Sequence, residues 1–124
     1  MFETEYAKIE YNKNQNIVLH TWKKACSYDD YRIPVMESLK LLAEHEGSNF
    51  VVDARNGFED EKDDVEWGFN FFLPEMKKTS CKKWFFIVNK VSDIEGELDL
   101  WSKEIMKYFE VIRIRSLDEV LRYL

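Results

Sequence analysis

The sequence has 124 residues, a formal net charge of −6 and a hydrophobic content of 45%, with aromatic residues making up 15%. This is the length of one ordinary domain, and a chain of this size buries enough surface to fold without disulfides or metals. Its basic residues are spread along the chain, which disfavours a nucleic-acid-binding protein because such binding depends on clustered Lys and Arg. We therefore expect a single domain over residues 1–124.

The sequence also carries no recognisable targeting segment. No secretory signal follows Met1, and no apolar run approaches the roughly 20 residues that span a bilayer. The two cysteines, Cys26 and Cys81, lie far apart in the sequence and are expected to be free thiols. These features predict a cytoplasmic protein without a membrane span.

The first half of the chain predicts a hairpin, a helix and a buried strand. Apolar and polar residues alternate over 5–11, and a polar turn over 12–16 leads to an apolar strand over 17–22. The short turn makes this pair antiparallel. Ser27 and Asp30 predict a capping box for a helix that ends before Gly47. Because of Pro34, this helix either begins near Ile33 or is kinked in its first turns. A short buried strand over 50–53 follows.

The second half alternates helices with strands. Apolar spacing predicts a helix over 65–76, with Asp63 and Glu66 capping its start and Pro74 distorting its last turns. A strand over 84–88, a helix over 98–109 and a strand over 111–115 come next. A capping box at 116–119 predicts a final helix that runs to Leu124.

This element order predicts an α/β fold. Strands that are separated by helices are normally parallel. We therefore expect a mixed five-stranded sheet, four strands parallel and the first antiparallel, covered by about four helices.

Four segments matter for their order and spacing along the chain: Val18 to Trp22, Phe50 to Asn56, Phe72 to Pro74 and Leu117 to Leu124. Considered together, they resemble the STAS family, in its SpoIIAA-like branch that is related to lipid carriers, and this resemblance covers nearly the whole chain. The resemblance implies a SpoIIAA-like fold and a role in protein–protein interaction. It also implies that binding of an apolar molecule or lipid is an alternative role.

One segment departs from the family pattern. Anti-sigma-factor antagonists of this fold carry a phosphorylatable serine at the start of the second helix, but residues 57–64 contain no hydroxyl side chain. The phosphorylation switch is therefore not expected here. The acidic residues of this segment either imitate a phosphorylated turn or simply complement the helix dipole.

Two groups of residues are candidate binding sites. Asp53, Arg55 and Asn56 follow the central strand, and ligands in open α/β sheets bind outside the carboxyl ends of strands. Alternatively, they only stabilise the turn. Trp67 and Phe71 fall on the helix face opposite the predicted core face, where exposed aromatic residues mark an interface or groove. Alternatively, a neighbouring helix or the acidic loop covers them.

The sequence offers little chemistry for catalysis or metal binding. Two histidines and two distant cysteines have no metal-ligand spacing, so we expect no metal and no cofactor. Cys26 follows two lysines that would lower its thiol pKa, but no histidine stands in register as a base. The sequence thus predicts a non-catalytic interaction module with a protein partner or a second copy. Carriage of a small apolar ligand is the alternative, and an enzyme built on Asp53 and Arg55 or on Cys26 is the third hypothesis.

Overall fold

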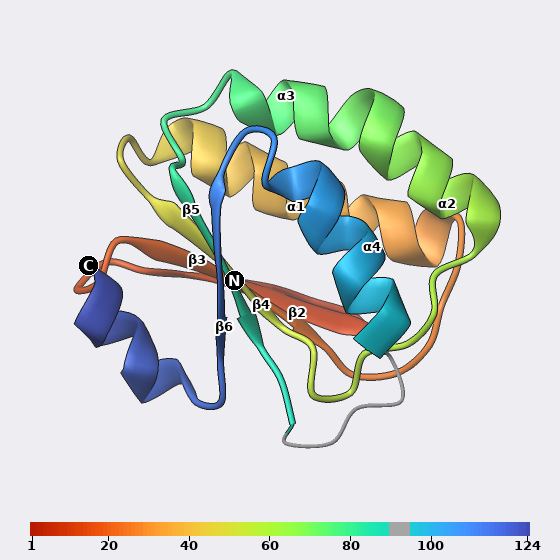
Figure 1. Ribbon diagram of the computed structural model, residues 1–124, viewed down its shortest axis with the longest axis horizontal. Coiled ribbons are helices and arrows are strands. Elements are labelled where there is room, and N and C mark those ends of the chain that lie inside the picture. The colour runs from red at the N-terminus through yellow and green to blue at the C-terminus, as the bar shows by residue number, and fades with distance from the viewer. Residues whose placement is uncertain (90–94) are drawn as a thin grey trace.

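Six strands form one mixed sheet in the order β1-β2-β3-β4-β5-β6 (Figure 1). The computed structural model describes residues 1–89 and 95–124. Its strands are β1 (Phe2–Glu3), β2 (Ala7–Asn12), β3 (Ile17–Trp22), β4 (Asn49–Asp53), β5 (Lys83–Ile87) and β6 (Glu110–Ile114). Strands β1, β2 and β3 pair antiparallel, and each later strand pairs parallel with the one before it.

The α/β class and the mixed sheet are confirmed, but the number of strands was predicted wrongly. The sheet has a sixth strand, β1, which pairs Phe2 with Ile9 and Glu3 with Lys8. A strand of two residues has no alternation to detect, so sequence periodicity could not reveal it. The side chain of Thr4 holds the turn that follows, because its Oγ1 accepts the backbone N–H groups of Tyr6 and Ala7.

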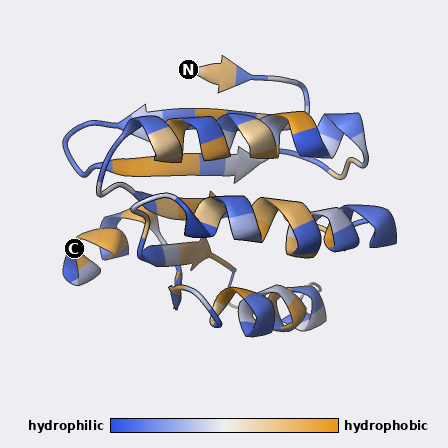
Figure 2. Cartoon of the chain, turned by 90° about the horizontal axis from the view of Figure 1, so that it is seen from above, coloured by the Kyte–Doolittle hydropathy of each residue, from blue (hydrophilic) through white to orange (hydrophobic). Residues whose placement is uncertain are grey.

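Three helical segments lie side by side over one face of the sheet, as Figure 2 shows from above. The first is α1 (Asp29–Glu44). The second runs without a break through α2 (Lys62–Trp67), a π-helical turn η1 (Gly68–Phe72) and α3 (Leu73–Lys77). The third is α4 (Glu95–Ile105). Each segment connects two neighbouring parallel strands, as expected for such a sheet.

The opposite face is covered by η2 (Leu117–Tyr123), a short 3₁₀ helix. The sequence predicts a capped helix here, but the Ser116 side chain makes no capping bond. The side chain of Glu119 instead accepts the backbone N–H of Arg115. Val120 on this helix is fully buried against the sheet.

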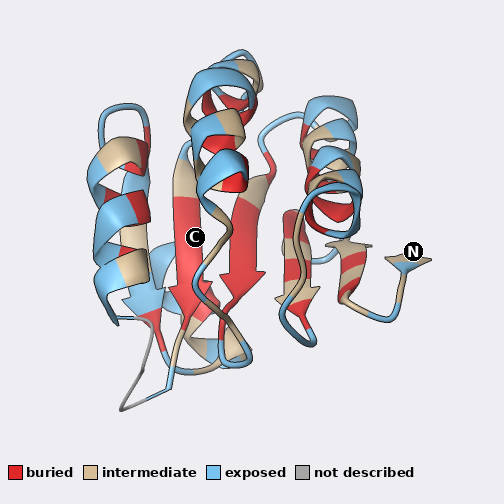
Figure 3. Cartoon of the chain, turned by 90° about the vertical axis from the view of Figure 1, so that its right-hand side faces the viewer, coloured by how far each residue is buried: buried red, intermediate tan, exposed pale blue. Residues whose placement is uncertain are grey.

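Because both faces are covered, the two central strands are the most deeply buried part of the sheet (Figure 3). Their residues form near-continuous apolar runs, as strands buried on both faces do. Phe50, Val52, Trp84 and Phe86 face α1 to α4 and belong to the larger hydrophobic cluster. On the other face a smaller cluster lies under η2, and its buried members are Ile17, Val51, Phe85, Ile87, Ile114 and Val120.

The start of α1 differs from the predicted capping box. The N-cap residue is Tyr28, whose φ of 52° is unusual for a residue other than glycine, and its side chain makes no capping bond. The buried carboxylate of Asp64 in α2 takes this role, because its Oδ2 accepts the backbone N–H of Tyr28 at 2.9 Å. A residue 36 positions away in sequence thus holds the start of the helix, which no local motif predicts.

Pro34 lies inside α1, and the helix continues through it. A proline has no N–H to donate to the carbonyl four residues earlier, here that of Asp30. The Cys26 thiol lies 3.5 Å from this carbonyl oxygen and donates to it. The helix therefore begins at Asp29 rather than near Ile33, with one side-chain donor in place of a missing backbone donor.

Candidate functional site

A partly enclosed cavity lies between the sheet and the helices, near the carboxyl ends of β3 and β4. Its volume is about 70 Å³. We call it the aromatic cavity, because nine of its lining residues carry aromatic rings other than histidine, and all four tryptophans of the chain are among them. It is lined by His20, Trp22, Tyr31, Val35, Phe50, Val52, Ala54, Gly57, Phe58, Asp60, Trp67, Phe72, Trp84, Phe86, Glu97, Leu98 and Trp101.

Alternation along the strands places the floor of the cavity. His20 and Trp22 are two residues apart on β3, so both side chains point to the helix-covered face. The half-buried lining residues form its rim, and they come from the loop before α2, from α2 itself and from α4: Gly57, Phe58, Asp60, Trp67 and Glu97. The cavity thus has a buried floor and a rim that contacts solvent.

The π-helical turn brings Trp67 to the cavity. In such a turn the hydrogen bonds join residues five apart, and the N–H of Leu73 donates to the carbonyl of Gly68. The ring of Trp67 consequently stacks on that of Phe72, with centroids 6.1 Å apart and an interplanar angle of 9°. Phe72 belongs to the core, so Trp67 lies closer to the core face than a regular helix would place it.

Gly68 allows α4 to approach this turn closely. A Cβ atom at Gly68 would lie 2.3 Å from the nearest ring atom of Trp101, which is far inside contact distance. The Trp101 ring in turn packs edge-on against Phe69, with centroids 4.9 Å apart. The absence of a side chain at Gly68 therefore sets the position of the Trp101 wall.

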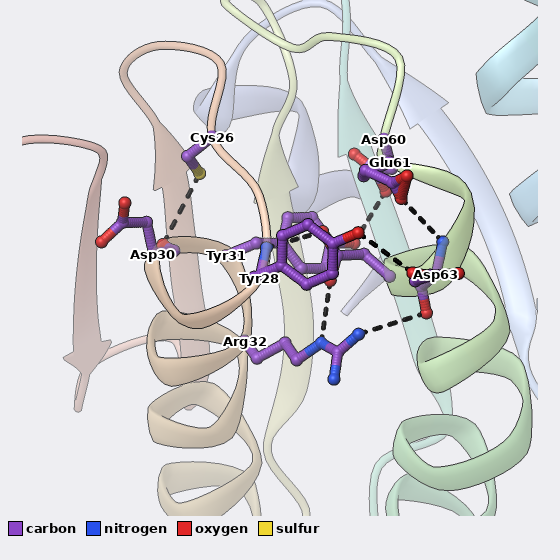
Figure 4. Close-up of polar contacts among 9 residues, drawn as sticks. Cys26, Tyr28, Asp30, Tyr31, Arg32, Asp60, Glu61 and Asp63 are labelled. Carbon is purple, nitrogen blue, oxygen red and sulfur yellow. Dashed lines mark hydrogen bonds and ion pairs between the residues drawn. The ribbon is translucent and has the colours of Figure 1, made fainter.

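Two carboxyl groups meet at the rim. The Tyr31 hydroxyl donates to Asp60 Oδ2 at 2.7 Å, as Figure 4 shows, and Trp101 Nε1 donates to Glu97 Oε2 at 2.8 Å. The backbone N–H of Asp60 donates to the same Glu97 oxygen at 3.4 Å. Burial, together with the neighbouring carboxylates of Glu97 and Asp64, raises the pKa of Asp60 to about 7, against the opposing hydrogen bonds of Tyr31 and Trp101. Asp60 therefore exchanges its proton near neutral pH.

Two fully buried ring nitrogens of lining residues have no hydrogen-bond partner within the described parts of the chain: His20 Nε2 and Trp84 Nε1. His20 is 1% exposed, and its Nδ1 lies 2.8 Å from the Ser38 hydroxyl. Burial lowers the pKa of His20 to about 3, so its ring is neutral at physiological pH. Buried polar atoms are normally paired, so two unpaired nitrogens in one cavity wall mark it as a candidate binding site.

The loop and helix beside the rim are held by further polar contacts (Figure 4). Arg32 Nε donates to the fully buried Asp64 at 2.8 Å, and the Tyr28 hydroxyl donates to Asp63 at 3.0 Å. Glu61 caps α2, because its side chain accepts the backbone N–H of Asp63; this differs from the predicted caps. The acidic segment 57–64 therefore directs several carboxylates inward to α1.

Cys26 lies close to these acidic groups. Burial raises the pKa of its thiol to about 12, and the carboxylates of Asp30, Asp60 and Asp64 contribute to this shift. This is opposite to the lowering that the two preceding lysines suggested in the sequence. A protonated thiol is a weak nucleophile, so Cys26 acts here as the donor to Asp30.

The first predicted group, Asp53, Arg55 and Asn56, does not line the aromatic cavity. The Arg55 side chain pairs with both oxygens of Asp53, at 3.0 and 2.6 Å, and the Arg55 backbone N–H donates to the same carboxylate. Asn56 is exposed. These contacts form a local turn after β4, whereas the adjacent residues Ala54 and Gly57 contribute to the cavity.

Of the second predicted pair, Trp67 and Phe71, only Trp67 lines the aromatic cavity. Phe71 is 41% exposed on the outer surface, although their rings stack with centroids 5.7 Å apart. Both also line a shallow outer groove between α1 and η1, together with Arg32, Ile33, Met36, Glu37 and Lys40.

Three polar residues of the site were not predicted from the sequence: His20, Asp60 and Glu97. His20 has no metal-ligand spacing, but a histidine on the inward face of a buried strand is a visible signal of a polar group in the core. Asp60 was one of several acidic residues in its segment. Glu97 approaches it from 37 positions away, so their contact had no signal in a single sequence.

Residues 1–89 and 95–124 contain no group of three or more His, Cys, Asp or Glu side chains placed to hold a metal ion. Over the same ranges, no helix combines the length and the apolar character needed to cross a membrane. Comparison of the chain with protein-family models, curated proteins and solved structures found no match. The fold therefore defines the class, an α/β domain with a mixed sheet, and the resemblance to the STAS family remains a hypothesis.

Proposed function

We propose that this domain binds a small, largely apolar molecule in the aromatic cavity. One observation carries the proposal: the cavity wall gathers all four tryptophans around a space of about 70 Å³. Ligand sites are typically concave, mostly apolar and supplied with a few polar groups, and this cavity has that composition. The proposal corresponds to the alternative function that the sequence suggested, and it needs no catalytic residue.

The size of the cavity limits the ligand. A cavity of about 150 Å³ holds benzene, which has six non-hydrogen atoms, so a cavity of this size encloses roughly three, and the rest of a ligand would lie at the rim that contacts solvent. A long acyl chain is much larger than this. We therefore propose a compact molecule or a compact end group rather than a whole lipid.

The tryptophans provide the experiment. NMR spectra would record the four indole N–H signals while toluene, or an alcohol ending in a tert-butyl group, is added to the labelled protein. We expect saturable shifts of the indole signals, because every tryptophan lines the cavity. A native mass spectrum of the purified protein would also reveal a ligand retained from the cell. The proposal would be contradicted if the indole signals showed no saturable shifts and the mass spectrum showed no retained ligand.

A variant that fills the cavity is the direct control. Ala54 lines the cavity and is 8% exposed, so Ala54→Leu places three additional carbon atoms there and should abolish the shifts. Ala43→Leu makes the same substitution at an exposed position of α1 outside the cavity and should leave the shifts unchanged. If Ala54→Leu fails to fold, Val52→Leu adds only one methylene group to the same wall.

Self-association through the outer groove is the second candidate function, and it corresponds to the interaction module that the sequence suggested. It is favoured by three exposed apolar side chains that line one groove: Ile33, Met36 and Phe71, which are 54%, 38% and 41% exposed. Exposed apolar residues gathered in one patch often mark an interface. Sedimentation would test it, because replacing Ile33 and Phe71 by serine should convert a dimer to a monomer. A monomeric unaltered protein would contradict it.

A further inference from the structure

The charged groups of the aromatic cavity have only one sign. Asp60 and Glu97 are its acidic lining residues, and no lysine or arginine of residues 1–89 and 95–124 is among the lining residues. Arg32 lines the outer groove instead. Its guanidinium group donates to Asp64 and lies over the ring of Trp67, which also lines that groove. The lining histidine, His20, is held neutral by burial. The part of the cavity wall that the structure describes therefore presents negative charge and aromatic rings without a cationic group.

The two carboxyl groups have no cationic partner among the described residues. Their hydrogen-bond donors are neutral: the Tyr31 hydroxyl, the Trp101 indole and a backbone N–H. Neither Asp60 nor Glu97 forms an ion pair within residues 1–89 and 95–124. By contrast, the nearby Asp64 is neutralised by Arg32. A partly buried negative charge is costly unless an opposite charge compensates it.

Aromatic rings near these carboxyl groups add a second attraction for a cation. Trp22 and Tyr31 stack with centroids 5.1 Å apart, and the Phe58 ring stands nearly perpendicular to both, at 74° and 78°. Trp101 contributes a further ring beside Glu97. The negative faces of aromatic rings attract organic cations, most strongly when the cation is desolvated, as in the aromatic sites that bind quaternary ammonium groups.

From this combination we propose that the ligand of the aromatic cavity is a small organic cation of the methylated ammonium class. This inference rests on the proposed function and specifies its ligand. Apolar methyl groups suit the aromatic wall, and the positive charge complements Asp60 and Glu97. A tetramethylammonium ion has five non-hydrogen atoms and the cavity encloses roughly three, so part of the cation would lie at the half-buried rim, beside Asp60 and Glu97.

A matched pair of ligands tests the charge. Choline and its tert-butyl analogue, in which carbon replaces the positive nitrogen, have nearly the same shape. We expect choline to shift the indole N–H signals with an affinity at least about tenfold higher than that of the analogue. Equal or tighter binding of the analogue would overturn the cation inference and leave the proposed function intact. If choline, the tert-butyl analogue and toluene all fail to bind, the cation inference and the proposed function are both overturned.

A charge-neutral substitution tests the carboxylate. Glu97→Gln keeps an oxygen that accepts from Trp101 and removes the charge, so the affinity for choline should fall about tenfold while that for the tert-butyl analogue stays unchanged. Glu104→Gln is the control, because Glu104 lies on the same helix, pairs with Lys107 and is not a lining residue. Equal choline affinities in the two variants would contradict a direct role of Glu97.

The pH dependence gives an independent readout. Asp60 faces the Tyr31 hydroxyl from α1, Glu97 from α4 and Asp64 from α2, and it loses its proton as the pH rises through about 7. The affinity for choline should therefore increase between pH 6 and pH 8. The affinity for the tert-butyl analogue should stay constant, and a parallel change for both compounds would contradict the inference.

The source of the cation is tested with phosphocholine. Its phosphate would lie close to a rim that carries two carboxyl groups, so we expect weaker binding than that of choline. Tighter binding of phosphocholine would overturn the assignment of a free cation and point to a phosphorylated head group.

Discussion

The two faces of the sheet differ in how they are packed. Under η2, six buried apolar side chains fill the space between the sheet and one short helix. Under α1 to α4, a larger and strongly aromatic cluster leaves a cavity of about 70 Å³, and the two fully buried ring nitrogens that lack a partner among the described residues lie there. Close packing such as that under η2 serves stability. The space on the other face is what a binding site needs, so we propose a purely structural role for the first face and a binding role, besides the packing of the larger cluster, for the second.

The largest expected effect is on the tightly packed face. Phe85 on β5 is fully buried and contacts Tyr123 of η2. Phe85→Ala should lower the free energy of unfolding by about 3–5 kcal/mol, because the removal of a buried ring leaves a cavity that the surrounding side chains fill only in part. Urea denaturation would measure this loss. In the folded fraction, the indole N–H shifts caused by choline should persist, and their disappearance would contradict the division of roles.

A smaller effect is expected where α4 meets the π-helical turn. Gly68→Ala places a methyl group against the Trp101 ring, so it should cost about 1–3 kcal/mol and disturb the cavity wall. Gly96→Ala is the matched control, because nothing lies within 4 Å of its Cβ position. In a helix this change should be neutral or stabilise by up to about 1 kcal/mol. Equal unfolding free energies for the two variants would show that the Trp101 contact is unimportant.

The pH dependence of stability distinguishes two titratable groups that line the aromatic cavity, His20 and Asp60. The pKa of His20 falls from 6.5 to about 3 on folding, so the unfolded state takes up a proton and stability rises with pH between these values. The pKa of Asp60 rises from 3.8 to about 7, so the folded state holds a proton and stability falls with pH in that window. Between about pH 4 and pH 6.5 the two contributions oppose each other.

Removing one of the two groups should expose the other. In Asp60→Asn, stability should rise with pH more steeply than in the unaltered protein, by up to about 1.4 kcal/mol per pH unit between pH 4.5 and pH 6. Urea midpoints at several pH values would give the difference, in which contributions shared by both proteins cancel. Parallel curves would mean that Asp60 titrates normally in the folded protein.

The smallest effect is expected at the turn after β4. The Arg55 side chain is 49% exposed, and its pair with Asp53 competes with water. Arg55→Ala should therefore change the free energy of unfolding by less than about 1 kcal/mol. It should also leave choline binding unchanged, as should Asn56→Ala. A loss of binding in either variant, measured from the indole N–H signals, would return these residues to the site.

The sequence was a good guide to the layers of the fold because period-two and helical spacing of apolar residues reflect burial directly. The strand 84–88 and the helix after Leu98 follow such patterns. The prediction was weaker where tertiary contacts override local signals. The N-terminal cap of α1 comes from Asp64 in another helix. The hydrogen-bond donor that Pro34 lacks is replaced by the thiol of Cys26.

The candidate site was only partly visible for the same reason. A helical period of 3.6 residues places Trp67 away from the core face, and nothing in the local sequence indicates the π-helical turn that reverses this placement. Tyr31, Asp60 and Glu97 come from three separate segments. Their proximity depends on the packing of α1 and α4 against the loop between them, which a single sequence does not specify.

The π-helical turn makes the cavity sensitive to the length of the chain as well as to residue identity. Such a turn corresponds to one extra residue within an α-helix, and each residue of a regular helix rotates the following side chains by about 100°. Deleting Asn70, an exposed residue of this turn, would restore regular winding and shift Trp67 relative to Leu73 and Met76 by roughly that angle. A relative of this protein that is one residue shorter at this point would keep the sheet and its helices but lose one aromatic wall, and with it the means to hold the same ligand.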